Sequence, residues 1–346
     1  MPSFPDYPPS ALRALFIGVC LFAVAPACIA DDTGNSVFAL RNHNPFLQIF
    51  GLPTFQTASL AEDSDADYTV SLELANNADF GDTDTENFFI DGESYFLTLS
   101  TRRRIKSWLE LGADVPLVIH DGGFMDSGIK GWHDIFGMSN TKRRGLDNQL
   151  QYLYQANGST LYELSSSTSG IGDIQLTAAV PFRDQIKDGY ALALRSSLKL
   201  PTGDDKKLTG SGAVDFATAL YVSDVRTLLG RPLGISGFAG ALFLGGGNVL
   251  PTLQRDVLPF GGVSASWWFA QRFGMTIQVQ MQGPYFDSDI EELGGSTAQL
   301  DVGLTYRPAG RRSCWKFAVV EDIQADATTD FALHFSVDTR CGVVVN

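Results

Sequence analysis

The segment that decides the fold is Phe273-Gly274-Met275-Thr276-Ile277-Gln278-Val279-Gln280-Met281-Gln282. Apolar side chains occupy every odd position, and glycine, threonine or glutamine occupies every even position. An α-helix would mix these two sets around its axis, whereas a β-strand sends alternate side chains to opposite faces. The segment therefore predicts a strand with one apolar face and one polar face.

The same alternation recurs at eleven further places between residue 68 and the C-terminus. Each of these segments is about ten residues long, which is the length that a tilted strand needs to cross a bilayer. Together with the segment 273–282 they predict about twelve strands. They lie at residues 68–75, 94–103, 108–118, 173–182, 190–200, 213–222, 233–243, 260–269, 297–307, 314–323 and 331–340.

The lengths of the links between these segments are a second, independent signal. Short links mostly alternate with long polar ones, as in an outer-membrane barrel with turns in the periplasm and loops outside the cell. We therefore predict an all-β fold: an antiparallel transmembrane β-barrel of about 12 strands with short periplasmic turns and long extracellular loops. A secreted β-sandwich is the alternative, but nothing in a sandwich requires the links at one end of its strands to stay short. The short links are 104–107, 183–189, 270–272 and 308–313; the link 223–232 is somewhat longer; the long links are 76–93, 119–172, 201–212 and 283–296; the link 245–259 is intermediate, and 325–330 is a short exception.

The N-terminus, residues 1–30, is typical of a secretory signal peptide. Arg13 supplies one positive charge, a short apolar core follows it, and small residues precede the acidic start of the mature chain. We predict cleavage after Ala30, with cleavage after Ala27 as the alternative. Lipoprotein processing at Cys28 is disfavoured because a proline lies inside the motif. The mature chain is then exported to the cell outer membrane.

The rest of the chain divides into two parts. Residues 31–67 are expected to form a periplasmic N-terminal segment, in which the apolar stretch 42–53 folds into the periplasmic mouth as a partial plug. Residues 68–346 are expected to form the barrel, with the insertion 119–172 as an extracellular lid rather than a second domain. Within the insertion we expect a short helix at 129–136 and a hairpin made of 149–155 and 161–165 around Asn157-Gly158.

The charge balance restricts the partners. Acidic residues outnumber basic ones by 39 to 25, the formal net charge is −14, and no basic patch follows a helix. A general nucleic-acid binder is therefore not expected. Beyond the signal peptide no apolar run approaches the roughly 20 residues of a membrane-spanning helix. The expected partners are outer-membrane lipid and lipopolysaccharide, the barrel assembly machinery and a small-molecule solute.

Three motifs carry a family resemblance. Arg41-Asn42-His43-Asn44-Pro45-Phe46-Leu47-Gln48-Ile49-Phe50-Gly51-Leu52-Pro53, ahead of an alternating chain, resembles the opening of a proteobacterial outer-membrane family known as a domain of unknown function. Gly170-Ile171-Gly172-Asp173 and Leu198-Lys199-Leu200-Pro201-Thr202-Gly203-Asp204 resemble motifs that this family shares with outer-membrane channels of aromatic-degradation pathways. The resemblance covers nearly the whole mature chain. It implies a barrel in the outer membrane, and it transfers no catalytic residue.

The polar face of the strands is expected to line the lumen. Twelve strands enclose a bore between that of the filled eight-stranded barrel and that of the open porins. We therefore expect a channel or transporter for a small solute. An outer-membrane lipid-modifying enzyme and a non-transporting structural or adhesion barrel are the alternatives. The lumen-lining candidates are Glu73, Glu110, Asp114, Arg195, Lys199, Gln278, Gln280, Asp301, Arg307, Glu321 and His334.

Residues for catalysis or metal binding are scarce. The histidines show no metal-ligand spacing, so we assign no catalytic residue and no cofactor. Carboxylates crowd one expected extracellular loop, where hard oxygen ligands suit Ca²⁺ or Mg²⁺. The weak metal candidates are Asp79, Asp82, Asp84 and Glu86, for which a solvated loop is the favoured alternative.

A disulfide bond is expected between Cys314 and Cys341. These are the only cysteines left once the signal peptide is removed, and the periplasm is oxidising. A symmetric turn around residues 327–328 places the two cysteines directly opposite each other, and places Glu321 opposite His334 in the lumen. The opposite parity would turn Trp315 outward and push Glu321 into lipid. Two unpaired thiols are the alternative.

Overall fold

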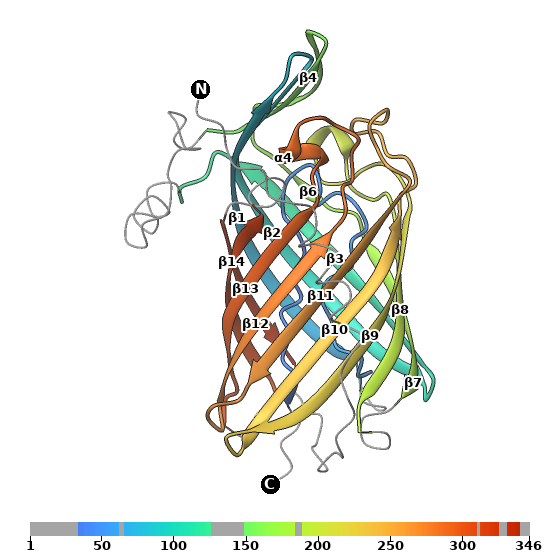
Figure 1. Cartoon of the computed structure of the whole chain (residues 1–346), viewed down its shortest axis with the longest axis vertical. Helices are drawn as coiled ribbons and strands as arrows, with labels where there is room; N and C mark the ends of the chain where they lie inside the picture. The colour runs from blue at the N-terminus through green and yellow to red at the C-terminus, as the bar shows by residue number, and fades with distance from the viewer. Residues whose placement is uncertain are drawn as a thin grey trace, which may run out of the picture.

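The computed structural model describes residues 34–61, 66–125, 149–183, 189–309, 312–324 and 331–339. Twelve antiparallel strands in this part of the chain close into a barrel, and three shorter strands extend its wall at one end (Figure 1). Among the described residues, no helix is both long and apolar enough to cross a bilayer. The signal peptide expected at 1–30 and the helix expected at 129–136 lie outside the described residues.

Each barrel strand pairs with its neighbours around the wall, and β1 pairs with β15 to close the circle. The prediction of an all-β barrel of about 12 strands is confirmed. The barrel strands are β1 (Asp67–Asp82), β2 (Glu86–Lys106), β3 (Leu109–Asp121), β7 (Gln175–Arg183), β8 (Ala191–Lys199), β9 (Asp215–Leu228), β10 (Arg231–Phe243), β11 (Val257–Trp267), β12 (Phe273–Gln282), β13 (Thr297–Tyr306), β14 (Cys314–Gln324) and β15 (Phe331–Asp338).

Between β3 and β7 the chain forms the hairpin that the sequence predicts. Asn157 and Gly158 join its two strands, and their positive φ angles of 50° and 74° are those of a type I′ turn. The first strand pairs with the outer end of β2, so the hairpin projects beyond the barrel rim (Figure 1). The additional elements are β4 (Gln151–Ala156), β5 (Ser159–Leu164), β6 (Thr168–Ile171), which pairs with the end of β3, and two short helical turns in the long loops, η2 (Asp205–Lys207) and α4 (Glu291–Gly294).

Strand β12 has the two faces that its sequence predicts. Met275 and Ile277 point outward and remain 37% and 44% exposed, whereas Gln278 and Gln280 point inward and are 0% and 5% exposed. An apolar outer belt is what contact with acyl chains requires. The protein is therefore an outer-membrane barrel with a polar lumen, as its alternation indicates.

Aromatic side chains ring the outer surface near the short turns. Tryptophan and tyrosine prefer the membrane–water boundary because one end of each ring is apolar and the other carries a polar group. This belt marks the periplasmic edge of the membrane. Its members include Tyr68, Trp108, Phe182, Phe273 and Trp315, each more than 40% exposed.

The connection between β9 and β10 is shorter than the sequence suggests. The expected link of 223–232 shrinks to Leu229 and Gly230, which both have positive φ angles, 51° and 72°. Such a two-residue turn matches the right-handed twist of the strands it joins. The predicted link was too long because both strands continue past their apolar segments to the periplasmic edge. There the backbone pairing persists, although apolar and polar residues no longer alternate.

The expected extracellular loop 76–93 is instead strand. β1 runs to Asp82, β2 starts at Glu86, and the two remain paired up to Asp82 and Asn87. This part of the sheet lies above the apolar belt, and its inward positions include the buried apolar side chains Phe88 and Ile90, so the inner face is no longer polar. The alternation of apolar and polar residues therefore disappears although the hydrogen-bonded ladder continues.

The register expected for the last two strands is also wrong. Cys314 lies opposite Asp338, and Ala318 lies opposite His334. A shift of odd parity turns every side chain to the other face, so Trp315 points outward and is 50% exposed. Glu321 consequently leaves the lumen. It lies opposite Phe331 at the extracellular end of the strand, where the cost of an outward carboxylate is small.

Candidate functional site

The lumen is occupied by the chain's own N-terminal segment, residues 34–61, which we call the plug. It appears as the blue segment inside the barrel in Figure 1. The plug rises from the periplasmic end, turns near the long loops and descends again. Its two limbs meet where the Phe55 N–H donates to the Leu40 carbonyl (3.3 Å).

The ascending limb is held mainly by neutral polar side chains of the wall, and in addition the Lys316 ammonium donates to the Val37 carbonyl (2.8 Å). The Trp268 indole N–H donates to the Gly34 carbonyl (3.2 Å), and the Ser36 and Thr305 hydroxyls lie 2.7 Å apart. Gln278 acts like a neighbouring strand, because its amide donates to the Phe38 carbonyl (3.1 Å) and accepts from the Phe38 N–H (3.2 Å). These bonds satisfy backbone groups that would otherwise be buried without partners.

The turn of the plug lies against aromatic residues of the extracellular end. Phe46 packs edge-on against Phe88 (5.4 Å between ring centroids), and Phe50 stacks on Tyr285 (5.1 Å). The descending limb then places Phe55 edge-on against Phe238 (4.7 Å). Burial of each such ring contributes about 1.5–3 kcal/mol.

The position of this turn corrects the expectation for residues 42–53. They were expected at the periplasmic mouth, but Gln48 donates to the Leu208 carbonyl, and Leu208 belongs to the long loop after β8. The physical reason is the aromatic and aliphatic content of 46–50. Those side chains find apolar partners among the long loops, whereas the periplasmic half of the lumen offers mainly polar and charged groups, such as Ser266 and the Arg195–Glu110 pair.

Burial alters the acidity of two tyrosines beside the turn. Burial is the main cause that raises the pKa of Tyr162, with the nearby charge of Asp205 as a further cause. Its hydroxyl donates to the Asp205 and Lys206 carbonyls (3.1 Å each). Burial likewise raises the pKa of Tyr285, so both phenols stay neutral. The plug therefore contacts neutral aromatic surfaces here rather than phenolates.

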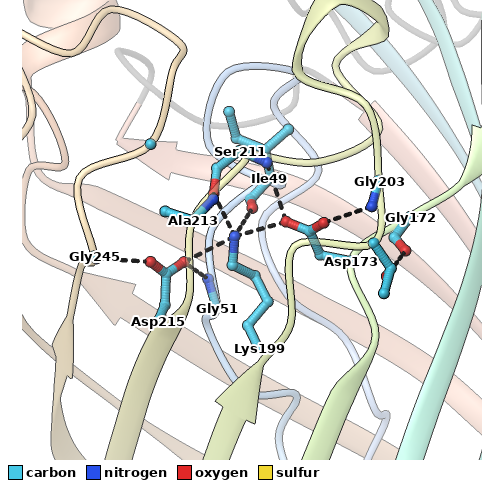
Figure 2. Close-up of polar contacts among 12 residues, drawn as sticks. Ile49, Gly51, Gly172, Asp173, Lys199, Gly203, Ser211, Ala213, Asp215 and Gly245 are labelled. Carbon is cyan, nitrogen blue, oxygen red and sulfur yellow. Dashed lines mark hydrogen bonds and ion pairs between the residues drawn. The ribbon is translucent and has the colours of Figure 1, made fainter.

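Lys199 forms the centre of a buried polar cluster that holds the turn, which we call the latch (Figure 2). Its ammonium lies 2.6 Å from Asp173 Oδ2 and 3.1 Å from Asp215 Oδ2, and it also contacts the Ser211 hydroxyl. It donates to the carbonyl of Ile49 in the plug (3.0 Å). Each ionic side chain of the latch is at most 4% exposed, so its charges rely on one another.

The carboxylates of the latch also bind backbone amides. Asp215 accepts from the N–H of Gly51 in the plug (2.9 Å) and from Gly245 (3.0 Å), while Asp173 accepts from Gly203 (2.8 Å). Gly51 leaves no room for a side chain, since a β-carbon there would lie 2.9 Å from that of Asp215. The plug backbone thus fits closely against the latch.

All three motifs that carry the family resemblance meet at the latch. The plug motif contributes its turn, the Gly170–Asp173 motif contributes Asp173, and the 198–204 motif contributes Lys199 and Gly203. Thr202 additionally donates to the Gly172 carbonyl (2.8 Å). Segments far apart in the sequence are therefore parts of one structure (Figure 2).

The other lumen candidates lie in pairs or small groups. Arg195 contacts Glu110 (2.6 Å) and also donates to the plug carbonyls of Thr57 and Ser59. Asp301 accepts from three glutamines, two of which are the candidates Gln278 (2.8 Å) and Gln280 (3.0 Å). The remaining pairs are Asp114 with Arg102 (2.8 Å) and Glu73 with His334 (2.9 Å).

Two candidates lie elsewhere, and several participants were not foreseen. The Arg307 guanidinium lies over the Trp268 ring (4.4 Å) near the periplasmic end, and Glu321 faces outward. Sequence analysis missed Ser211, at the end of the long link 201–212, and Asp215, near the start of the strand predicted at 213–222. A signal was present: both lie close to the point where a predicted strand begins, as Asp173 does in its motif.

The four acidic metal candidates are not gathered by the fold. Asp79 points into the barrel, whereas Asp82, Asp84 and Glu86 lie around the turn between β1 and β2, where Glu86 accepts from the Ser288 hydroxyl. Within the described ranges, no group of three or more His, Cys, Asp or Glu side chains is arranged to hold a metal ion.

The fold and the lumen define an outer-membrane β-barrel that holds its own N-terminal segment inside. The chain belongs to the family described as "Protein of unknown function (DUF3187)", whose model matches residues 14–341. The resemblance inferred from the three motifs is thereby confirmed. The comparison with curated proteins found no match.

Among solved structures, the chain is similar to the COG4313 outer membrane channel from Pseudomonas putida F1. The two share 13% identity over 81% of this chain and 96% of the other, with a TM-score of 0.51. Two more distant matches are the NanC porin (6% identity, 79% of this chain and 98% of the other, TM-score 0.40) and the Pseudomonas putida toluene transporter TodX (8% identity, 88% and 99% coverage, TM-score 0.37). At these identities the similarity shows the fold alone.

Proposed function

We propose that this protein is a gated outer-membrane channel for a small solute, closed in the present state by the plug. The observation that carries the proposal is the latch, in which Lys199, Asp173 and Asp215 are buried to hold the turn of the plug. An eight-stranded barrel fills its lumen with wall side chains, whereas a twelve-stranded barrel leaves room for a separate segment. A separate segment with its own anchoring site supports a part that moves.

The plug is also bound unevenly, which supports movement. Its ascending limb is held chiefly by neutral hydrogen bonds, each of which contributes a net of about 0.5–1.5 kcal/mol, and by a single charged donor, Lys316, to the Val37 carbonyl within the described residues. Its turn and descending limb engage the charged groups Lys199, Asp215 and Arg195. Contacts to charged groups are about twice as strong. The turn is therefore the part whose release controls opening.

Deletion of residues 34–61 is expected to convert a closed barrel into an open pore. Single-channel recording in planar bilayers should show rare openings for the wild type and a sustained conductance for the deletion variant. The strand ladder does not involve these residues, and heat-modifiable mobility on gels checks that the barrel folds. A folded deletion variant without conductance would contradict the proposal.

A cross-link provides an independent control. The Ser36 and Thr305 hydroxyls lie 2.7 Å apart, so the Ser36→Cys/Thr305→Cys variant is expected to form a disulfide that fixes the ascending limb to the wall. Oxidation of this variant should abolish the rare openings that the wild type shows, and reductant should restore them. Unchanged openings in the oxidised variant would show that the plug does not leave the lumen. The wild type treated in the same way reports any effect of the native cysteines.

We further propose that Cys314 and Cys341 form a disulfide in the mature protein. Cys314 is buried opposite Asp338, and Cys341 follows three positions later, outside the described residues. The expected result is no alkylated cysteine without reductant and two with it, measured by mass spectrometry. Two alkylated cysteines in the unreduced, unfolded protein would exclude the bond.

A further inference from the structure

Among the described residues, Arg41 of the plug has no hydrogen-bonded or ion-paired partner, although it lies inside the lumen. The basic groups around it do not share this state, because Lys199, Arg195 and Arg102 each hold a carboxylate at 2.6–2.8 Å. A guanidinium carries five N–H donors, and leaving them unused away from bulk water is costly.

The carboxylates near Arg41 are already engaged. Its charge interacts electrostatically with Asp114, Glu73 and Asp173, which come from different parts of the wall. Each of these carboxylates lies within 2.9 Å of another basic side chain. None of them is within ion-pair distance of Arg41, so its positive charge is balanced only at longer range.

Space remains next to Arg41. It is partly exposed, whereas the whole stretch 42–52 that follows it is buried. Because groups from several sides of the wall surround Arg41, this exposed surface lies inside the barrel. Inward-facing Thr98, Ser100 and Thr177 are also partly exposed, so accessible polar surface remains on the side of β2, β3 and β7.

A second polar group beside Arg41 lacks partners. His43 is 4% exposed, and neither of its ring nitrogens makes a hydrogen bond within the described residues. Its ring stacks on Phe96 (4.3 Å between ring centroids), which presents an apolar face close to the cation. The surroundings of Arg41 thus combine one uncommitted charge, unused hydrogen-bonding atoms and an aromatic wall.

We propose that Arg41 is the binding residue for a small solute that carries a carboxylate, held against the partly exposed polar surface beside the plug. The planar guanidinium matches a carboxylate through two parallel hydrogen bonds. This inference rests on the proposed channel function and names the class of solute. It assigns the plug a role in recognition in addition to closure.

The test uses three probes that differ mainly in charge: benzoate, benzyl alcohol and benzylammonium. Isothermal titration of the full-length mature protein in detergent is expected to show benzoate binding at least about tenfold more tightly than benzyl alcohol, with benzylammonium weakest. Arg41→Gln should weaken benzoate to the level of benzyl alcohol. Arg41→Lys keeps the positive charge but loses the two parallel N–H donors of the guanidinium, so it should bind benzoate with intermediate affinity.

Arg307→Gln is the matched control, because Arg307 has no carboxylate within ion-pair distance in the described part of the chain either, but lies over Trp268 near the periplasmic end. It should leave benzoate binding unchanged. Equal affinities of the three probes, absence of benzoate binding to the wild type, or unaltered binding by Arg41→Gln would each overturn the proposal. Conductance of the plug deletion is measured separately, so the channel function can stand where carboxylate recognition fails.

Discussion

Lys199→Met is expected to raise the open probability of the channel strongly. The substitution removes the ammonium from between Asp173 and Asp215 and leaves two buried carboxylates facing each other. Removing one partner of a buried ion pair costs about 3–5 kcal/mol. Ile49 in the plug also loses its hydrogen bond. The substitution therefore destabilises the closed state, which needs the latch. The open state is affected less, because water can hydrate the two carboxylates there.

Single-channel recording measures the change, and two variants make it specific. Arg255→Met removes the exposed ion pair with Asp287 in the same extracellular region and should leave the closed state intact. Lys199→Met/Asp215→Asn leaves only one buried carboxylate, so it should recover part of the closure. An open probability of Lys199→Met equal to that of the wild type would show that the latch does not hold the plug.

Ile277→Arg is expected to destabilise the inserted barrel by about 2–4 kcal/mol, the cost of arginine on the lipid face near mid-bilayer. Ile277 lies in the middle of β12, points outward and is 44% exposed. The neighbouring Gln278→Arg should cost far less, because Asp301 accepts from Gln278 at 2.8 Å and offers the new guanidinium a carboxylate. The two substitutions introduce the same side chain one position apart.

Urea titration of the protein folded into lipid vesicles measures both unfolding free energies. The wild type provides the reference, and the retained mobility of the folded form on gels confirms insertion. Equal losses for the two variants would refute the assignment of faces on β12. Gln278→Arg also removes the paired hydrogen bonds to Phe38, so a change in conductance without a large loss of stability is expected there.

The wall of the barrel was predictable because its signals are local. Apolar and polar residues alternate on β12 because one face of the strand contacts lipid and the other faces the lumen. Each residue type reflects the face it occupies, whatever the distant segments are. Link lengths are likewise visible along the chain. The signals fail above the apolar belt, as between Asn76 and Glu93, where inward positions such as Phe88 and Ile90 are apolar, so alternation there no longer indicates the strand pairing.

The latch was only partly predictable. Lys199 was identified as a lumen residue because its parity on β8 is inward. Its partners Asp173 and Asp215 stand in loop-to-strand junctions, where parity gives no direction. The register of β14 against β15 failed for a related reason. A turn centre misplaced by a residue or two alters every pairing beyond it, and Glu321 was accordingly assigned to the wrong face.

The sequence by itself determined an exported, acidic, all-β chain whose strands have one face for lipid and one for water. This follows from a period of two residues, which needs no knowledge of the closed barrel. Only the tertiary structure decided what fills the lumen: Ser36 meets Thr305 across 269 positions of sequence, and Lys199 meets the plug across 150. Such contacts depend on how strand tilt and stagger bring distant positions to the same height, and that geometry exists only once the barrel has closed.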